Sequence, residues 1–329
     1  MVTGKGGVGK TTVAAAIGVL AADRGLRTII VEVGEQNRLS GLFGLAPPSP
    51  GVEMKLQDRL SSISIDPDRA LMEWLQTLGG RVPGRVLASS STFQYFAAAA
   101  PGAKELVGMV KIWELTQQRR RRGSSHYDLV VLDAPATGHA LGMLSSPRTF
   151  GAIARVGPIA GQAQRLGELL ADPERCGYLA VAQGSEMAIT ETLELQDALR
   201  TELGRELEAV IVNGLLPRRF TDAELGRLTR LVGDRLATDE RASTRAKRPA
   251  GHGAAPRART RVRAGNTDAV THAAARAAHA VHDRARLQRN QVARLRRRGL
   301  DVIAVPYQFA PELDLPSIRR IAEHLGRKL

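Results

Sequence analysis

Nine residues near the start of the chain combine glycine, lysine and threonine at a spacing suited to phosphate chemistry. The segment Gly4-Lys5-Gly6-Gly7-Val8-Gly9-Lys10-Thr11-Thr12 fits G-x-x-x-x-G-K-[ST], the loop that wraps nucleotide phosphates. Its glycines let backbone N–H groups approach phosphate oxygens, because no Cβ atom stands in the way. We therefore predict that nine residues bind the nucleotide: Gly4, Lys5, Gly6, Gly7, Val8, Gly9, Lys10, Thr11 and Thr12.

The end of this loop also supplies catalytic and metal-binding groups. We predict that Lys10 reaches the β- and γ-phosphates and that the Thr11 hydroxyl binds Mg²⁺. The Ala- and Val-rich residues 13–20 predict a helix, whose N-terminus favours bound anions. A glycine-rich turn with two surface lysines is the alternative, but the spacing, the paired threonines and the following helix all favour the phosphate loop.

A second segment ends in an acidic residue after an apolar run. Residues 129–132, Leu-Val-Val-Leu, predict a buried parallel strand that ends at Asp133. An acidic residue at the carboxyl end of such a strand is the usual second partner of Mg²⁺ in phosphate-loop enzymes. Asp133 and Thr11 are therefore the predicted metal ligands, with ATP as the nucleotide and Mg²⁺ as the cofactor.

Two features of these motifs resemble one family. Lys5 is an additional lysine inside the loop, and the string Asp133-Ala134-Pro135-Ala136-Thr137-Gly138-His139 follows the second strand. The chain resembles the ArsA/Get-type ATPases, which include the arsenite-pump and tail-anchored-protein-targeting ATPases. The resemblance implies a dimer in which Lys5 acts catalytically on the partner's nucleotide. It also implies that Pro135 and Gly138 shape a loop that senses the γ-phosphate.

Two later segments agree with this resemblance. Residues 208–212 form an apolar run that ends at Asn213, where the family places an adenine contact, and residues 302–305 precede Pro306, which matches the family's adenine-binding loop. Asn213 and Pro306 are therefore predicted nucleotide-binding residues. Taken alone, each segment is typical of an ordinary transition from strand to turn.

The residues after the second strand depart from the family pattern. Aligning Leu39-Ser40 with the family places Gly34 where the water-positioning aspartate belongs. Glu32 and Glu35 flank that position, and either carboxylate could orient a water molecule. We prefer Glu32 as the third catalytic residue, because it lies at the strand end near the phosphates. Slow hydrolysis, or a partner subunit with a better site, would follow from this departure.

Cysteine usage narrows the choice within the family. Cys176 is the only cysteine, whereas arsenite-binding members use several thiols and eukaryotic targeting members use a C-x-x-C pair for zinc. One thiol supports neither site within a subunit. The absence of disulfide pairs fits a reducing cytoplasm.

Apolar runs alternating with helical stretches predict the fold. Strands are expected at 28–33, 128–132, 178–182, 208–212 and 301–305, with a shorter one near 61–65. This predicts an α/β phosphate-loop NTPase, a single domain over 1–329 with a mostly parallel sheet flanked by helices and a helical insert at about 67–122. Only Met1, Val2 and Thr3 precede the loop, so we expect either a truncated first strand or a start further upstream, and we favour the latter.

One helix of the insert carries an apolar stripe. Leu106, Met109, Val110 and Trp113 are spaced i, i+3, i+4, i+7 on one helix face. In the family this region changes shape with nucleotide and, in targeting members, binds an apolar client helix. We favour an ordinary core face, because any packed helix needs one apolar stripe.

The net charge of +14 is concentrated in one region. Residues 238–298 hold 16 Lys and Arg against 4 Asp and Glu, which gives +12. Residues 238–268 have a low-complexity composition, and 269–298 predict a basic helix. The region lacks aromatic residues for base stacking, so a solvated arm is favoured over nucleic-acid binding.

These observations together predict a Mg²⁺-dependent ATPase of the ArsA/Get type. It would form a nucleotide-gated homodimer, or a heterodimer with a related ATPase, coupled to a membrane-protein client or an anion-transport partner. The alternatives are a partition-type ATPase that binds DNA non-specifically and a nucleotide switch with low turnover. No apolar run approaches the roughly 20 residues that span a bilayer and no signal precedes the loop, so a cytoplasmic location is expected.

Overall fold

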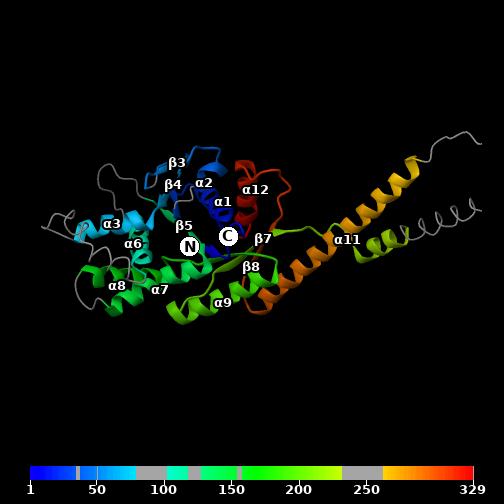
Figure 1. The fold of residues 1–329 in the computed structure, drawn as a ribbon. Helices are drawn as coiled ribbons and strands as arrows, with labels where there is room; N and C mark the ends of the chain where they lie inside the picture. The colour runs from blue at the N-terminus through cyan, green and yellow to red at the C-terminus, as the bar shows by residue number, and fades with distance from the viewer. Residues whose placement is uncertain are drawn as a thin grey trace, which may run out of the picture. The chain divides into compact units, whose positions relative to one another are not determined.

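The computed structural model describes residues 1–34, 38–49, 51–78, 102–117, 127–153, 158–231 and 262–328. An eight-stranded sheet in the order β3-β4-β2-β5-β1-β6-β7-β8 forms the centre of the fold (Figure 1). Every neighbouring pair is parallel except β3 with β4. The predicted α/β class with a mostly parallel sheet is confirmed. The strands are β1 (Val2–Gly4), β2 (Thr28–Val33), β3 (Met54–Gln57), β4 (Leu60–Ile65), β5 (Leu129–Ala136), β6 (Leu179–Gln183), β7 (Ala209–Leu215) and β8 (Val302–Pro306).

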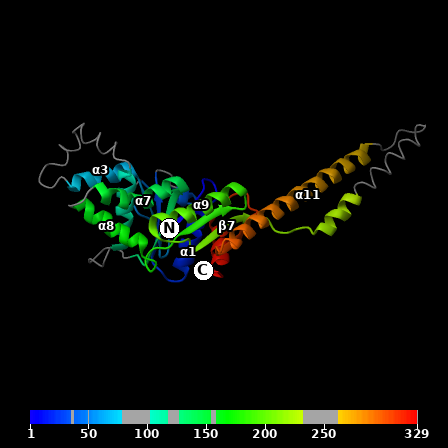
Figure 2. The ribbon, with the colours of Figure 1, turned by 90° about the horizontal axis from the view of Figure 1, so that it is seen from below.

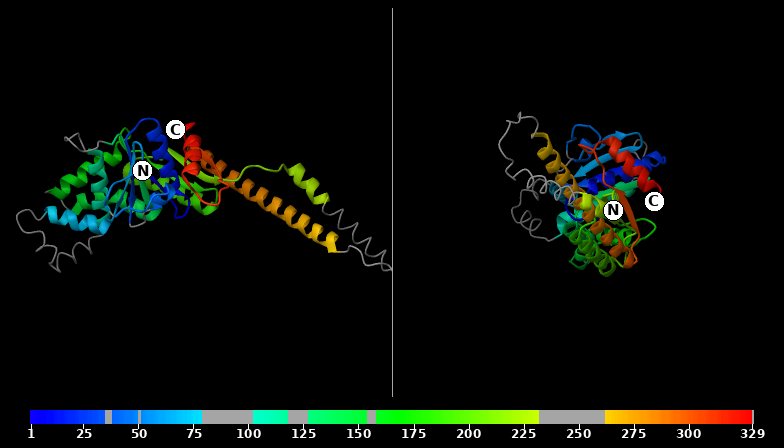
Figure 3. Two further views of the ribbon diagram at one scale, coloured as in Figure 1. Left: turned by 90° about the horizontal axis from the view of Figure 1, so that it is seen from above. Right: turned by 90° about the vertical axis from the view of Figure 1, so that its right-hand side faces the viewer.

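Helices cover both faces of this sheet. Helices α1 (Lys10–Asp23) and α12 (Leu315–Gly326) pack together on one face, which Figure 3 shows from above. Helices α7 (Thr137–Ile153) and α9 (Glu186–Leu203) lie on the opposite face, and α8 (Pro158–Ala171) packs on α7 (Figure 2). Further helices in the described residues are α2 (Arg38–Leu42), α3 (Pro67–Leu78), α6 (Ala103–Gln117) and α11 (Val262–Arg297), and residues 222–231 are also helical.

Burial on both faces explains the continuous apolar runs of the central strands. Residues 28–32 of β2 are buried one after another, because helices exclude water from both sides of the sheet. Gly18 lets α1 approach closely, since a Cβ atom there would lie 2.6 Å from Ile30 Cδ1. The three-residue β1 lies between β5 and β6, where Val2 pairs with Asp133 and Leu179. The phosphate loop therefore leaves the middle of the sheet.

Three local predictions need correction. Strand β5 continues to Ala136 and passes directly into α7, so Pro135 lies in the strand and Gly138 in the first helical turn instead of a loop. Ala136 pairs with Gly4, and this pairing extends the strand. The antiparallel β3 was not predicted. Helix α11 begins at Val262 instead of 269, because Arg and Ala favour helix enough to accommodate a single glycine, which costs about 1 kcal/mol.

The helical insert is described in part. Helices α3 and α6 pack against each other, whereas 79–101 and 118–126 lie outside the described residues. Leu106, Met109 and Val110 are buried in the main core, and the partly buried Trp113 packs against it. The interpretation of this stripe as a core face is confirmed. None of the described helices combines the length and apolarity needed to cross a membrane.

The described residues divide into two compact units. One comprises Met1–Leu215 with Gln291–Leu329, and the other comprises Leu216–Asn290. In the second unit His282 Nε2 lies 3.0 Å from a carboxylate oxygen of Asp222, which begins the helical segment 222–231. Residues 232–261, most of the predicted low-complexity segment, lie outside the described residues. The prediction of a single ATPase domain stays a prediction, because compact units need not fold independently.

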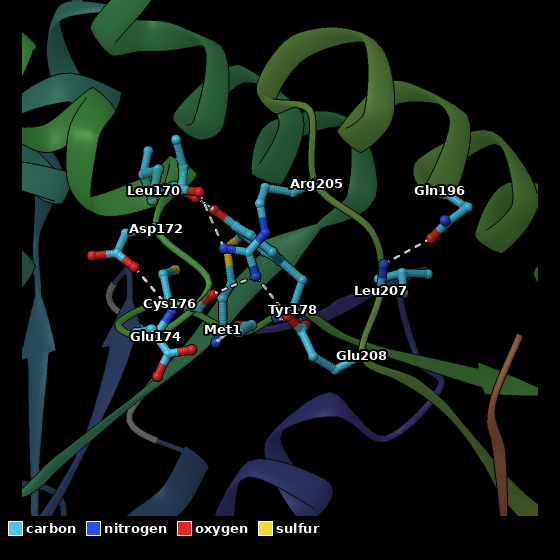
Figure 4. Close-up of polar contacts among 12 residues, drawn as sticks. Met1, Leu170, Asp172, Glu174, Cys176, Tyr178, Gln196, Arg205, Leu207 and Glu208 are labelled. Atoms are coloured by element: carbon cyan, nitrogen blue, oxygen red, sulfur yellow. Dashed lines mark hydrogen bonds and ion pairs between the residues drawn. The ribbon is translucent and has the colours of Figure 1, made fainter.

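A polar cluster joins β6 and β7 at the amino edge of the sheet, where these strands begin. We call it the Arg205 cluster; it comprises Arg205, Tyr178 and Glu208 (Figure 4). The Arg205 guanidinium donates to the Cys176 carbonyl at 2.9 Å and to Glu208 at 2.7 Å, and it lies over the Tyr178 ring. Glu208 in turn accepts from the Tyr178 backbone N–H. The cluster fixes the starts of both strands relative to each other.

Candidate active site

The phosphate loop leaves β1 at the carboxyl edge of the sheet and ends where α1 begins at Lys10. Two of its glycines are required by the space around them. A Cβ atom on Gly4 would lie 2.1 Å from the Val181 carbonyl oxygen, and one on Gly9 would lie 2.3 Å from Asn213 Nδ2. Both residues also have positive φ, of 146° and 96°. Only glycine fits these positions, so the sequence folds into the tight loop that phosphate binding needs.

Lys10, Thr11 and Asp133 converge where this loop meets β5. Lys10 Nζ donates to the Lys5 carbonyl at 3.0 Å, and Thr11 Oγ1 donates to Asp133 Oδ2 at 2.6 Å. Burial lowers the pKa of Lys10 and raises the pKa of Asp133. The site thus brings one cation, one hydroxyl and one carboxylate together beside the loop.

The second oxygen of Asp133 tests whether this site fits a metal ion. Within the described part of the chain, Asp133 Oδ1 is buried and has no hydrogen-bond partner. Buried polar atoms are nearly always paired, so such an atom needs an explanation. Carboxylate and hydroxyl oxygens are ligands that Mg²⁺ prefers, and Mg²⁺ commonly uses one or two protein oxygens with phosphates and water. Thr11 and Asp133 fit this cation.

Glu32 lies beside Asp133 on the adjacent strand. The two residues are register partners in β2 and β5, and Glu32 is 7% exposed. Its Oε1 accepts the backbone N–H groups of Arg38 at 3.0 Å and Leu39 at 3.3 Å, at the start of α2. Burial raises the pKa of Glu32 to about 7, although these two hydrogen bonds oppose the shift. Glu32 therefore connects the start of α2 to the strand beside β5.

Gly34 occupies the position where the family pattern has an aspartate. Its φ is 106°, a conformation that side chains with a Cβ atom rarely adopt. Its N–H donates to the Ile65 carbonyl at 2.9 Å, and its own carbonyl accepts from Ser64 Oγ at 2.6 Å. The backbone conformation at position 34 thus favours glycine over the aspartate of the family pattern. Glu35, the alternative carboxylate, lies outside the described residues.

Lys5 and Asn213 hold the loop from its other side. Lys5 Nζ lies 2.5 Å from Glu191 Oε1 on α9, with both side chains 32% exposed. Asn213 Nδ2, on β7, donates to the Val8 carbonyl at 3.0 Å. Pro306 pairs with Leu215 on the neighbouring strand, so both predicted adenine contacts lie at the carboxyl edge. All predicted site residues that the structure describes are at this edge, where open α/β sheets bind ligands.

A protein-family model and several known proteins match the sequence of this chain. The family model described as "Anion-transporting ATPase" matches residues 1–160, which include the phosphate loop, Glu32 and Asp133. The chain belongs to the ArsA ATPase family. "ATPase BagA" of Mycobacterium tuberculosis is 28% identical over 235 residues, which cover 69% of this chain and 68% of that protein.

Two further relatives of this ArsA-family ATPase have names that state a function or a family. "ATPase GET3" of Mycosarcoma maydis is 25% identical over 271 residues, which cover 71% of this chain and 77% of that protein. The "Arsenical pump-driving ATPase" of Escherichia coli is 25% identical over 235 residues, which cover 65% of this chain and 39% of that protein.

Two contacts of this ArsA-family ATPase were not foreseen from its sequence. Gln183 Nε2 reaches the Gly7 carbonyl at 3.5 Å, and Glu191 pairs with Lys5. Gln183 ends β6, which pairs with β1, and Glu191 lies in α9, which follows β6. The available signal was a predicted strand just before Gln183, but the sequence does not show that this strand lies beside the phosphate loop.

Proposed function

We propose that this ArsA-family ATPase is Mg²⁺-dependent and works as a nucleotide-gated dimer. ATP binding would close the dimer, and hydrolysis would reopen it for a membrane-protein or anion-transport partner. The observation that supports the nucleotide and metal site best is the unpaired Asp133 Oδ1 beside the Thr11 hydroxyl and the Lys10 ammonium. Their chemistry suits a divalent cation together with phosphate oxygens.

Each residue at this site has a proposed role that follows from its contacts. Lys10 exchanges its neutral carbonyl acceptor for the β- and γ-phosphates, because an ammonium binds an anionic oxygen more strongly. Thr11 and Asp133 hold Mg²⁺, which when bound neutralises charge on the phosphate oxygens. Loop N–H groups bind the phosphates, and Asn213 and Pro306 lie on the strands proposed to flank the adenine.

Glu32 is the carboxylate that we assign to water positioning. It is the register partner of Asp133, so it lies at the strand end proposed to face the phosphates. Its hydrogen bonds to the backbone of residues 38 and 39 also place the start of α2. A Glu32→Ala variant without turnover, next to a Glu35→Ala variant with normal turnover, would support this assignment. The reverse result would transfer the role to Glu35.

The dimer and its partner rest on family likeness. The name of the Escherichia coli relative states that it drives an arsenical pump, which supports a transport or membrane-protein partner for this chain. The single Cys176 argues against a thiol cluster for arsenite within the subunit. In the proposed dimer, Lys5 reaches the nucleotide of the other subunit, which is either a second copy or a related ATPase.

The test is ATP turnover by the purified chain and by its Lys5→Ala variant, with molecular mass followed at each ATP concentration. The wild-type chain should hydrolyse ATP and should dimerise only with ATP and Mg²⁺. The Lys5→Ala variant should lose both the turnover and the dimerisation. Tight ATP binding without turnover would instead indicate a nucleotide switch or a missing partner subunit. Turnover by a protein that stays monomeric would contradict the dimer.

A further inference from the structure

The backbone carbonyl and the side-chain ammonium of Lys5 both bind residues of the same chain. Its backbone carbonyl accepts from Lys10 Nζ at 3.0 Å, and its ammonium pairs with Glu191 at 2.5 Å. In the described residues Glu191 has Lys5 as its only ion-pair partner. A lysine proposed to act on another subunit is therefore engaged by an acidic residue of its own subunit.

The Lys5 side chain contacts one face of the first two turns of α9. Met187 and Glu191 are four residues apart, so they lie on the same helix face, and both contact the Lys5 ammonium. Strand β6 leads into α9 and pairs with β1, which leads into the phosphate loop. This adjacency in the sheet brings Glu191 within reach of Lys5.

We propose that Glu191 is a positioning residue that retains Lys5 in its own subunit until the partner's nucleotide competes for it. This inference rests on the proposed function, in which Lys5 crosses a dimer interface. ATP bound in the same subunit would first draw Lys10 away from the Lys5 carbonyl. The Lys5 ammonium would then exchange one carboxylate for the phosphates of the partner's nucleotide when the dimer closes.

The exposure of the pair sets the size of the effect. Both side chains are 32% exposed, so water and salt weaken their attraction, and the pair restrains Lys5 without locking it. Removing the charge of Glu191 should lower the ATP concentration at half-maximal dimerisation by roughly two- to fivefold. An ion pair of this strength opposes dimerisation without ATP. It breaks when the phosphates of the partner's nucleotide compete for Lys5.

The experiment compares Glu191→Gln with a matched control on the same helix. Glu194→Gln removes a carboxylate that is exposed one turn further along α9. Dimer fraction is measured by sedimentation velocity across ATP concentrations at fixed Mg²⁺, and thermal unfolding is recorded for each variant. We expect the midpoint to fall only in Glu191→Gln, with an unchanged unfolding temperature in both variants.

A charge-preserving variant decides whether Glu191 acts through its carboxylate on Lys5. Glu191→Asp keeps the negative charge, so its midpoint should stay closer to the wild-type value than that of Glu191→Gln. An unchanged midpoint in Glu191→Gln, or an equal fall in Glu191→Asp and Glu191→Gln, would overturn the proposal while the dimer of the wild-type chain stands. If the wild-type chain forms no ATP-dependent dimer, the proposed function fails first and the role of Glu191 fails with it.

Discussion

The Arg205 cluster at the amino edge of the central sheet and the phosphate-loop site at its carboxyl edge differ in how well their polar groups are paired. At the amino edge, the Arg205 guanidinium donates to two backbone carbonyls and to Glu208 and lies over the Tyr178 ring. At the carboxyl edge, Asp133 Oδ1 is buried without a partner, and Lys10 donates to one neutral carbonyl.

The contrast separates stability from function. A buried polar group without a full set of partners lowers the stability of the folded chain by about 1–3 kcal/mol, and such groups persist where a ligand completes them. The Arg205 cluster has its polar groups paired, although Gln196 Nε2 nearby is buried without a partner among the described residues. We therefore expect substitutions at the amino edge to reduce stability, and substitutions at the carboxyl edge to reduce ATP turnover.

The largest expected effect is on turnover in Lys10→Met. This variant keeps most of the apolar stem and removes the ammonium proposed to bind the phosphates, so turnover should fall by about 10²–10³-fold. Without nucleotide, the free energy of unfolding should change by less than about 1 kcal/mol, because burial already disfavours the Lys10 charge. Steady-state kinetics and urea denaturation measure the two effects. A strongly destabilised variant would show that Lys10 serves the fold as well.

Arg205→Met should give the opposite result at the other edge. The substitution leaves the Glu208 carboxylate and the Ala171 and Cys176 carbonyls without their donor. We expect a loss of about 3 kcal/mol in the free energy of unfolding, at the lower end for a broken buried pair because Glu208 is 43% exposed. Turnover by the folded fraction should stay within about twofold.

Arg200→Met is the matched control for this loss. Arg200 pairs with Glu206, but the two side chains are 52% and 64% exposed. Because surface pairs are screened by water, urea denaturation should show a change below about 1 kcal/mol. Equal losses in the free energy of unfolding would show that the Arg205 cluster stabilises the fold no more than a surface ion pair does.

The third prediction concerns pH and Glu32. Its folded-state pKa is about 7 against an ordinary value of 4.5, so the folded chain holds this proton more tightly than the unfolded chain. Stability is therefore lost as pH rises from 4.5 through 7. Glu32→Gln keeps an acceptor oxygen and removes the charge. Without nucleotide or Mg²⁺, it should be more stable than the wild-type chain by up to about 3 kcal/mol at pH 8.

At pH 5 the difference between the two chains should be much smaller. Only the first part of the stability loss has occurred there, so urea denaturation should give Glu32→Gln an advantage of about 1 kcal/mol or less. Glu194→Gln, which alters an exposed carboxylate on α9, should follow the wild-type chain at both pH values. A Glu32→Gln variant that is no more stable at pH 8 would contradict the cost assigned to the buried charge.

Contacts set by local motifs were predictable from the sequence. The spacing of the phosphate loop and the apolar run before Asp133 predicted the elements that bring Thr11 and Asp133 together. Both motifs lie at strand ends, and parallel strands end at the same edge of a sheet. The strand positions were also close to those observed, because both faces of the sheet are buried and the strands are continuous apolar runs.

Contacts that depend on strand order were beyond the sequence pattern. Glu191 reaches Lys5 only because β6 lies beside β1, and no local signal places these strands together. The end of β5 was missed for a related reason, since its extension to Ala136 depends on pairing with Gly4. Gly34 could be aligned with the family pattern, but its positive φ is a property of the folded backbone.

The smallest expected effect separates one hydrogen bond from the rest of the Arg205 cluster. The fully buried Tyr178 hydroxyl donates to the Leu170 carbonyl at 2.7 Å. That carbonyl lies in the last turn of α8, where no following helical N–H reaches it. Burial raises the pKa of Tyr178, so the hydroxyl keeps its proton and serves as a donor at neutral pH. Tyr178→Phe should therefore lower the free energy of unfolding by about 1 kcal/mol with unchanged turnover.

The matched control is the half-exposed Tyr307. Its substitution to Phe should change the free energy of unfolding by less than about 0.5 kcal/mol. A Tyr178→Phe variant that loses turnover while keeping its stability would show that the amino edge communicates with the phosphate loop, and the separation of the two edges would fail.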